Sequence, residues 1–147
     1  MQLTSYTDYG LRVLIYLAAR GEGLSTTQQI ASAYGISLAH LTKVVQELAR
    51  GGYVATVRGR SGGLKLALPP EEIVIGDVVR FTEESLALVE CFDAKNGGSC
   101  RIQPVCELAR VMDEALRSFL GVLDRYTLAD IARRRTALRQ LLELGTG

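Results

Sequence analysis

Residues 25–68 constrain the fold more than any other part of this 147-residue chain. Ser25-Thr26-Thr27-Gln28 predicts a capping box that opens a short helix, and Gly35 ends that helix. Ser37 is expected to cap a second helix, whose apolar side chains recur at helical spacing as far as Gly51-Gly52. Two short helices joined by a glycine-containing turn are typical of a helix-turn-helix.

A predicted β-hairpin follows directly. Tyr53-Val-Ala-Thr-Val57 and Leu64-Lys-Leu-Ala-Leu68 have strand-like composition, and the loop between them is basic and glycine-rich. A helix-turn-helix followed by a hairpin is a winged helix. We therefore predict a mainly α fold with a small β-hairpin wing, in which Pro69-Pro70 closes a DNA-binding domain over residues 1–70.

The distribution of charge supports DNA binding by this first part. Residues 1–70 carry seven Lys and Arg against three Asp and Glu, whereas residues 71–147 carry ten against thirteen. Only the first part is therefore suited to a phosphate backbone. No apolar run is long enough to cross a membrane, and the amino terminus lacks the pattern of a signal peptide, so we expect a cytoplasmic protein.

The candidate DNA contacts lie on three predicted segments. The second helix of the motif should enter the major groove, the start of the first helix should position phosphates, and wing arginines are suited to a minor groove. His40 either reads DNA or is merely a surface residue. The full candidate set is Thr26, Gln28, Ser37, Ala39, His40, Lys43, Arg58, Arg60, Ser61 and Gly62.

The remainder of the chain divides into a connecting segment, residues 71–104, and a helical part, residues 105–147. A short helix is expected over residues 73–83. From Leu108 to Leu123, apolar residues recur at helical spacing for about five turns, a stripe that needs a partner surface. Thr127 is expected to cap one final helix from Leu128 onward.

All three cysteines, Cys91, Cys100 and Cys106, fall within sixteen residues, in the pattern C-x8-C-x5-C. Their number leaves one cysteine over if disulfides form, and one ligand short of a four-thiolate site. The spacing lacks the CxxC pair of structural zinc and the C-x2-C-x2-C run of bacterial ferredoxins. Spacing alone leaves an iron–sulfur cluster, a zinc site and unliganded redox thiols open.

Several segments together resemble a known family. They are LTSYTDYGLRVLIYLA, QIASAYGISLAHLTKVVQELARGGYVATVRGRSGGLKLA, IGDVVRFTE, the three cysteines and FLGVLDRYTLADI. They resemble the nitric-oxide-sensing repressors of a winged-helix, iron–sulfur regulator family that also includes IscR and RirA. The resemblance runs from Met1 to about Ala132 and implies a transcriptional repressor, with no enzymatic activity.

The resemblance also implies a cofactor, partners and ligands. It implies a homodimer joined through a long dimerisation helix, about Val105 to Asp124, that binds a palindromic operator in double-stranded DNA. Cys91, Cys100 and Cys106 would hold an iron–sulfur cluster, [4Fe–4S] with [2Fe–2S] as the alternative. Asp8 of the other subunit would be the fourth ligand, although Asp8 also suits the start of a helix. Nitrosylation of the cluster would release the operator and derepress nitric oxide detoxification genes.

Two departures bear on this assignment. The IscR pattern has a histidine shortly after its third cysteine, whereas residues 107–112 here are Glu-Leu-Ala-Arg-Val-Met, which disfavours an IscR-like role. The stretch TEESLALVECF also resembles RirA. An iron-responsive repressor therefore stands as the alternative function.

Overall fold

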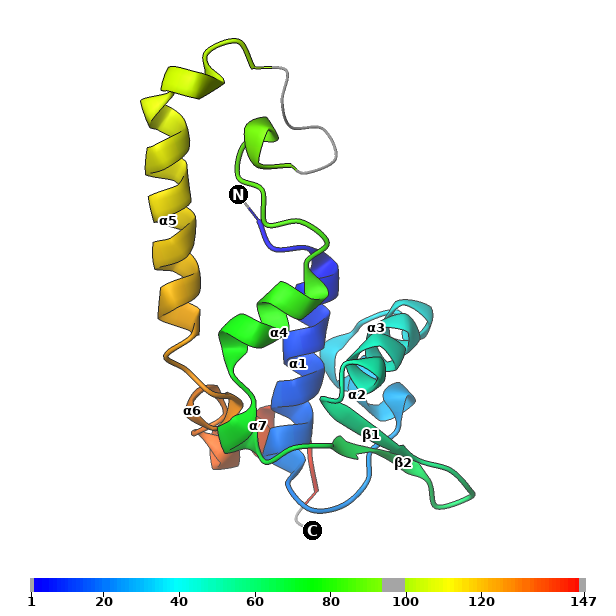
Figure 1. Ribbon diagram of the computed structural model, residues 1–147. Helices are drawn as coiled ribbons and strands as arrows, with labels where there is room; N and C mark the ends of the chain where they lie inside the picture. Colours follow the sequence, from blue (N-terminus) through cyan, green and yellow to red (C-terminus); the bar gives the residue numbers. More distant parts are fainter. Residues whose placement is uncertain (1, 94–99, 146–147) are drawn as a thin grey trace.

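The computed structural model describes residues 2–93 and 100–145, and Figure 1 shows their arrangement. This part of the chain is mainly helical, with one two-stranded antiparallel sheet and three short 3-10 turns. The elements are α1 (Ser5–Arg20), α2 (Thr27–Tyr34), α3 (Leu38–Arg50), β1 (Val54–Val57), β2 (Gly63–Leu66), η1 (Pro70–Glu72), α4 (Ile75–Thr82), η2 (Glu90–Phe92), η3 (Gln103–Val105), α5 (Glu107–Leu123), α6 (Leu128–Ile131) and α7 (Arg135–Leu141). The expected mainly α fold with a β-hairpin wing is confirmed.

Helix α1 is the centre of the core. It contacts α3, α4, α6, α7 and β2, so segments from both ends of the chain pack on it. Val13, Leu14, Leu17 and Ala19 on α1 are each at most 2% exposed. Burial of these apolar side chains contributes much of the free energy that stabilises the fold.

The helix-turn-helix is formed by α2 and α3, and its first cap lies one residue later than predicted. Thr26 is the N-cap of α2, and its side chain and that of Gln29 make the two reciprocal bonds of a capping box. Gly35 ends α2 in the left-handed conformation, with φ 63°. Ser37 occupies the N-cap position of α3, but its side chain makes no capping hydrogen bond, contrary to the prediction.

Ser25 has a different function from the predicted cap. Its amide donates to the carbonyl of Leu64 at 3.0 Å, and the amide of Leu64 donates back at 2.7 Å. Within the wing, β1 and β2 pair antiparallel with Val54 opposite Leu66. The loop before α2 therefore pairs with the wing at its base and ties the hairpin to the helix-turn-helix.

Helix α5 stands apart from the rest of the molecule (Figure 1). None of its residues is buried, and Leu108, Val111 and Val122 are 56%, 49% and 44% exposed. The apolar stripe expected in this region is thus present, and although α5 contacts α4, part of the stripe remains exposed in the single chain.

The C-terminal part differs from the prediction of one helix. Thr127 does cap α6 through a capping box with Asp130, but α6 ends at Ile131 and a separate helix α7 begins at Arg135. The turn between them returns the chain to α1, where Leu138 and Leu142 pack on the core. None of the helices in residues 2–93 and 100–145 combines the length and hydropathy needed to cross a membrane.

Candidate DNA-binding surface and cysteine segment

Helix α3 has one buried face and one exposed face. Leu41, Val44 and Leu48 are at most 1% exposed and fix the helix on the core. The predicted DNA contacts Ser37, Ala39, His40 and Lys43 are all exposed. The helix therefore presents an exposed face that includes the polar His40 and the basic Lys43, as a recognition helix requires.

The two predicted phosphate-contacting residues lie at the start of α2 and are exposed. The Thr26 hydroxyl already accepts the Gln29 amide at 3.1 Å. Gln28 Nε2 donates to Ser32 Oγ at 3.1 Å, which fixes the Gln28 side chain along the helix. Contact with phosphate by Gln28 would therefore compete with this bond.

The wing tip carries two arginines on a tight turn. Arg58, Arg60 and Ser61 are exposed, and neither arginine forms an ion pair with any residue the structure describes. Gly59 has φ 116°, a conformation that side-chain-bearing residues rarely adopt. The Gly62 amide donates to the Gly59 carbonyl at 3.0 Å, and a Cβ at Gly62 would collide with the Val57 carbonyl. The turn thus requires glycine at these positions and leaves both guanidinium groups free.

Tyr6 forms a contact with α3 that the sequence did not predict. The Tyr6 hydroxyl donates to the Lys43 carbonyl at 3.2 Å, joining the first turns of α1 to the recognition helix. Partial burial raises the pKa of Tyr6 above its ordinary value, so the hydroxyl keeps its proton and remains a donor at neutral pH. Only the distance between the two elements, which sequence does not give, reveals this contact.

The cysteines lie at the end of the molecule nearest the amino terminus. Cys91 is in η2, and Cys106 is at the N-cap position of α5; these elements lie at the same end as the start of the chain in Figure 1. Cys91 and Cys106 are half-buried and Cys100 is exposed, and none of them is in a disulfide. Three free thiols on one segment are the soft donors that iron–sulfur clusters and zinc prefer.

The donor chemistry suits a cluster, but the single chain does not assemble the site. Among residues 2–93 and 100–145, no three His, Cys, Asp or Glu side chains come together closely enough to hold a metal. To bind one cluster, the three thiols would have to come closer together. Asp8 lies in the first turn of α1, where the capping side chain is that of Thr4. Its carboxylate is 2.9 Å from Arg12 Nη2.

Comparison with known proteins agrees with this architecture. Residues 3–134 match the Rrf2 family, described as an iron-dependent transcriptional regulator. The chain is 55% identical to the HTH-type transcriptional regulator NsrR of Geobacillus kaustophilus, over 97% of each protein. Among solved structures, IscR of T. potens aligns with TM-score 0.73 and 27% identity, covering 100% of this chain and 94% of that one. CymR, the global cysteine regulator of B. subtilis, aligns with TM-score 0.69 and 30% identity, covering 90% and 97%.

The winged helix-turn-helix and the exposed face of α3 define a DNA-binding transcriptional regulator, not an enzyme. The chain belongs to the Rrf2 family.

Proposed function

We propose that this chain is a homodimeric transcriptional repressor that binds a palindromic operator and releases it in response to nitric oxide through a bound iron–sulfur cluster. The proposal rests chiefly on 55% identity, over 97% of the chain, to a regulator named NsrR. The nitric oxide signal comes from the resemblance to the nitric-oxide-sensing repressors. The three free thiols on one segment supply ligands for the cluster.

The exposed surface of α3 and the wing would make the DNA contacts. Placing α3 in the major groove turns Ala39, His40 and Lys43 toward base edges and phosphates. Arg58 and Arg60, which form no ion pair within the described part of the chain, would enter the adjacent minor groove, where negative potential attracts guanidinium groups. Ser61 and Gly62 would allow close approach of the wing turn. Thr26, Gln28 and Ser37 would contact phosphates.

A second copy of the chain is the partner that α5 requires. Its exposed apolar stripe, including Leu108 and Val111, would be buried against the same helix of the other subunit. A symmetric dimer presents two recognition helices to two half-sites, so operator affinity depends on the separation of those helices.

Cys91, Cys100 and Cys106 are the proposed cluster ligands, with Asp8 of the partner subunit as the fourth. A [4Fe–4S] cluster there would supply iron sites with which nitric oxide reacts. To serve as a ligand, Asp8 must leave Arg12, with which its carboxylate pairs at 2.9 Å. A carboxylate that can move between Arg12 and the cluster suits a ligand that is displaced from the cluster when the signal arrives.

Hydrogen bonds near the start of α1 support a mechanical link between the cysteine segment and the DNA-binding surface. Glu83, which precedes that segment, accepts the Thr4 amide at 2.8 Å and the Thr4 hydroxyl at 3.0 Å. Tyr6, two residues after Thr4, donates its hydroxyl hydrogen bond to the carbonyl of Lys43. Displacement of the segment would therefore move the start of α1 and, with it, the recognition helix.

Operator binding by anaerobically purified protein tests the proposal. We expect coloured protein that shifts operator DNA in a gel and loses that shift at stoichiometric nitric oxide. Cys106→Ser should abolish both colour and response, whereas Ser118→Ala, on α5, should change neither. A colourless protein with stoichiometric zinc would refute the cluster.

An iron-responsive repressor is the second candidate, because the family is described as iron-dependent. The same assay separates the two signals. DNA release on iron chelation, together with indifference to stoichiometric nitric oxide, would favour iron sensing and overturn the nitric oxide proposal.

A further inference from the structure

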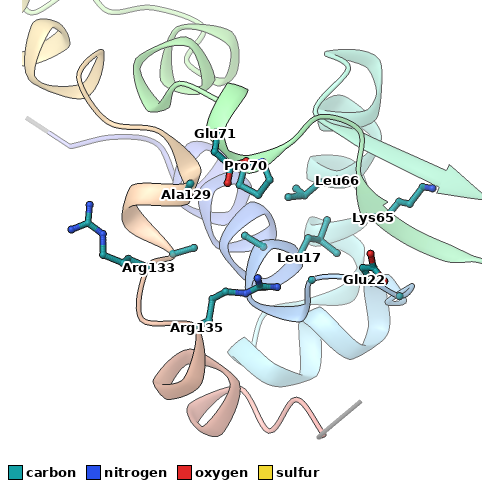
Figure 2. Close-up of a pocket in the computed structure, with 13 residues that line it drawn as sticks. Leu17, Glu22, Lys65, Leu66, Pro70, Glu71, Ala129, Arg133 and Arg135 are labelled. Carbon is teal, nitrogen blue, oxygen red and sulfur yellow. The ribbon is translucent and has the colours of Figure 1, made fainter.

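A cavity of about 460 Å³ lies between the base of the wing, the end of α1 and the C-terminal helices (Figure 2). It is far from the cysteine segment and does not include the exposed face of α3. Its volume falls within the range of small-molecule sites. Its lining comes from four separate stretches of the chain, namely residues 17–23, 65–66, 70–71 and 129–135.

The cavity has an apolar floor. Leu17, Ala18 and Ala132 are 2%, 5% and 4% exposed, and they belong to the core. Leu66 and Pro70 extend this surface on the wing side. A ligand with an apolar part would gain free energy chiefly by covering the half-buried Leu66, Pro70 and Ala129, because the floor residues are already almost fully buried.

Arg135 is the cation that faces this floor. In Figure 2 its side chain points toward Leu17, whereas those of Arg133 and Lys65 extend outward. Its guanidinium lies over the backbone of Gly21, where any Cβ would collide with Nη2. Gly21, at φ 73°, therefore makes room for the arginine.

Arg135 also lacks a protein partner within the part of the chain that the structure describes. Arg133 pairs with Asp130 at 3.1 Å, and Arg139 donates to the carbonyl of Arg20 at 3.3 Å. No such bond or ion pair is formed by Arg135 in residues 2–93 and 100–145. All five of its donors are therefore free for a planar carboxylate, which a guanidinium binds through two parallel hydrogen bonds.

The charges around the cavity limit the kind of anion. Three basic residues and two glutamates line it, Lys65, Arg133, Arg135, Glu22 and Glu71, so one positive charge remains. Neither glutamate forms an ion pair with Arg135 in the described structure. A nucleotide or other polyanion would be repelled by the two carboxylates, whereas a single carboxylate matches the remaining charge.

We propose that this cavity is a binding site for a small organic monocarboxylate, with its carboxylate on Arg135 and its apolar part on Leu66, Pro70 and Ala129. Such a ligand would touch β2 at Leu66 as well as α1 and α6. The base of the wing is otherwise tied to the loop before α2 by the Ser25–Leu64 pair. Occupancy would therefore fix the wing relative to the core and change operator affinity.

Binding can be measured on the full-length protein without DNA. The probes are benzoate and hexanoate, each compared with its uncharged amide, in ligand-observed NMR at up to about 10 mM, a concentration suited to fragment-sized ligands. We expect the carboxylates to bind and the amides to bind at least tenfold more weakly, since a charged hydrogen-bonded pair is lost. Equal binding of acid and amide, or none by either acid, would overturn the proposal.

Two variants locate the site. Arg135→Gln should weaken carboxylate binding about tenfold or more, whereas Arg134→Gln, which removes the same charge from a residue outside the cavity lining, should not. Equal loss in both variants would mean that only net charge matters and would refute the site. Ala129→Leu, which places a bulky side chain in the apolar lining but keeps Arg135, should also weaken binding of the probes, so the test does not depend on one variant folding.

The effect on the wing rests on the proposed DNA-binding function and is measured separately. Saturating benzoate should change operator affinity of wild-type protein and leave that of Arg135→Gln unchanged. Ligand binding without this change would overturn the coupling to the wing alone. If Arg135→Gln instead lowers the salt dependence of operator binding in the absence of any probe, Arg135 contacts phosphate and the monocarboxylate site is refuted.

Discussion

Two threonine hydroxyls form a buried connection between the first helix and α4. Thr7 is 0% exposed and its Oγ1 donates to Thr82 Oγ1 at 2.8 Å; Thr82 donates in turn to the Val78 carbonyl at 2.8 Å. When a buried hydroxyl loses its hydrogen-bond partner, the free-energy cost of removing that hydroxyl from water is no longer offset. The pair therefore fixes the amino-terminal end of α1 on α4.

Replacing one hydroxyl of this pair should destabilise the protein measurably. We expect Thr7→Val to lower the free energy of unfolding by about 1 kcal/mol, and urea unfolding at fixed protein concentration would measure it. Thr42→Val, at an exposed threonine of α3, is the control and should change stability by less than about 0.5 kcal/mol. The double variant Thr7→Val with Thr82→Val should cost less than the two single changes together; strict additivity would show that the hydroxyls act independently.

At the scale of elements, one ion pair links α4 to the end of α5. Arg80 donates to both carboxylate oxygens of Asp124, each at 2.7 Å, at the end of α5. Gly76 leaves room for this pair, because a Cβ at this position would collide with the Asp124 carboxylate where it now lies. No residue of α5 is buried, and this ion pair, the α4–α5 clamp, is one of the contacts that hold the helix on α4.

The clamp should give stability a specific pH dependence. Its hydrogen bonds to Arg80 hold the pKa of Asp124 below the ordinary value, so the carboxylate stabilises the fold above about pH 4. That contribution is lost as the pH falls through the lowered pKa of the folded protein. Thermal unfolding of wild type and Arg80→Met should therefore differ at neutral pH and converge as the pH falls below about 4.

A matched variant on α5 separates the clamp from surface charge in general. Among the residues that the structure describes, Arg110 pairs only with exposed glutamates of its own helix. Arg110→Met should follow the wild-type curve at every pH. An equal effect of Arg80→Met and Arg110→Met would show that the α4–α5 pair has no special stabilising function.

At the scale of the whole molecule, the apolar stripe of α5 should control association. We expect Leu108→Glu to reduce the molar mass in sedimentation toward that of one 16.0 kDa chain and to weaken operator binding. Leu108 is 56% exposed in the single chain, so the substitution should leave the fold of each subunit intact by circular dichroism. Arg117→Gln, on the polar face of α5, is the control; an unchanged mass for Leu108→Glu would place the interface elsewhere.

The wing should contribute electrostatically to DNA binding. Replacing Arg58 and Arg60 by Ala should weaken operator binding, and the slope of log affinity against log salt should become shallower by up to about two per subunit. Gel shifts over a series of salt concentrations measure this. Arg125→Gln removes a cation from the end of α5 and should leave the slope unchanged. The same slope in the wing variant and wild type would mean that the wing does not approach DNA.

Local patterns explain what the sequence predicted well. The helix-turn-helix, the hairpin and the stripe of α5 are each indicated by short-range spacing. Gly35 and Gly59 also mark turns, because glycine readily adopts the positive φ that these turns need. The exposed recognition residues followed from the same periodicity, since the buried face of α3 was evident from Leu41, Val44 and Leu48.

Long-range pairing explains what the sequence could not predict. Ser25 was a plausible helix cap, but its backbone pairs with Leu64, thirty-nine positions away in the chain. The break between α6 and α7 has no glycine or proline to mark it; the chain turns so that Leu138 and Leu142 reach α1. Likewise, Arg135 lies on Gly21 only because the two ends of the chain meet.

The central position of α1 has a consequence for synthesis on the ribosome. This helix packs against α6 and α7, which are translated after it, and Arg139 donates to the carbonyl of Arg20. The α3, α4 and β2 contacts of α1 can form earlier, but the part of its surface that α6 and α7 cover stays exposed until those two helices have been translated. Premature termination before Leu128 would release a nascent chain in which α1 cannot complete its packing, and such a product is a natural substrate for chaperones and proteases.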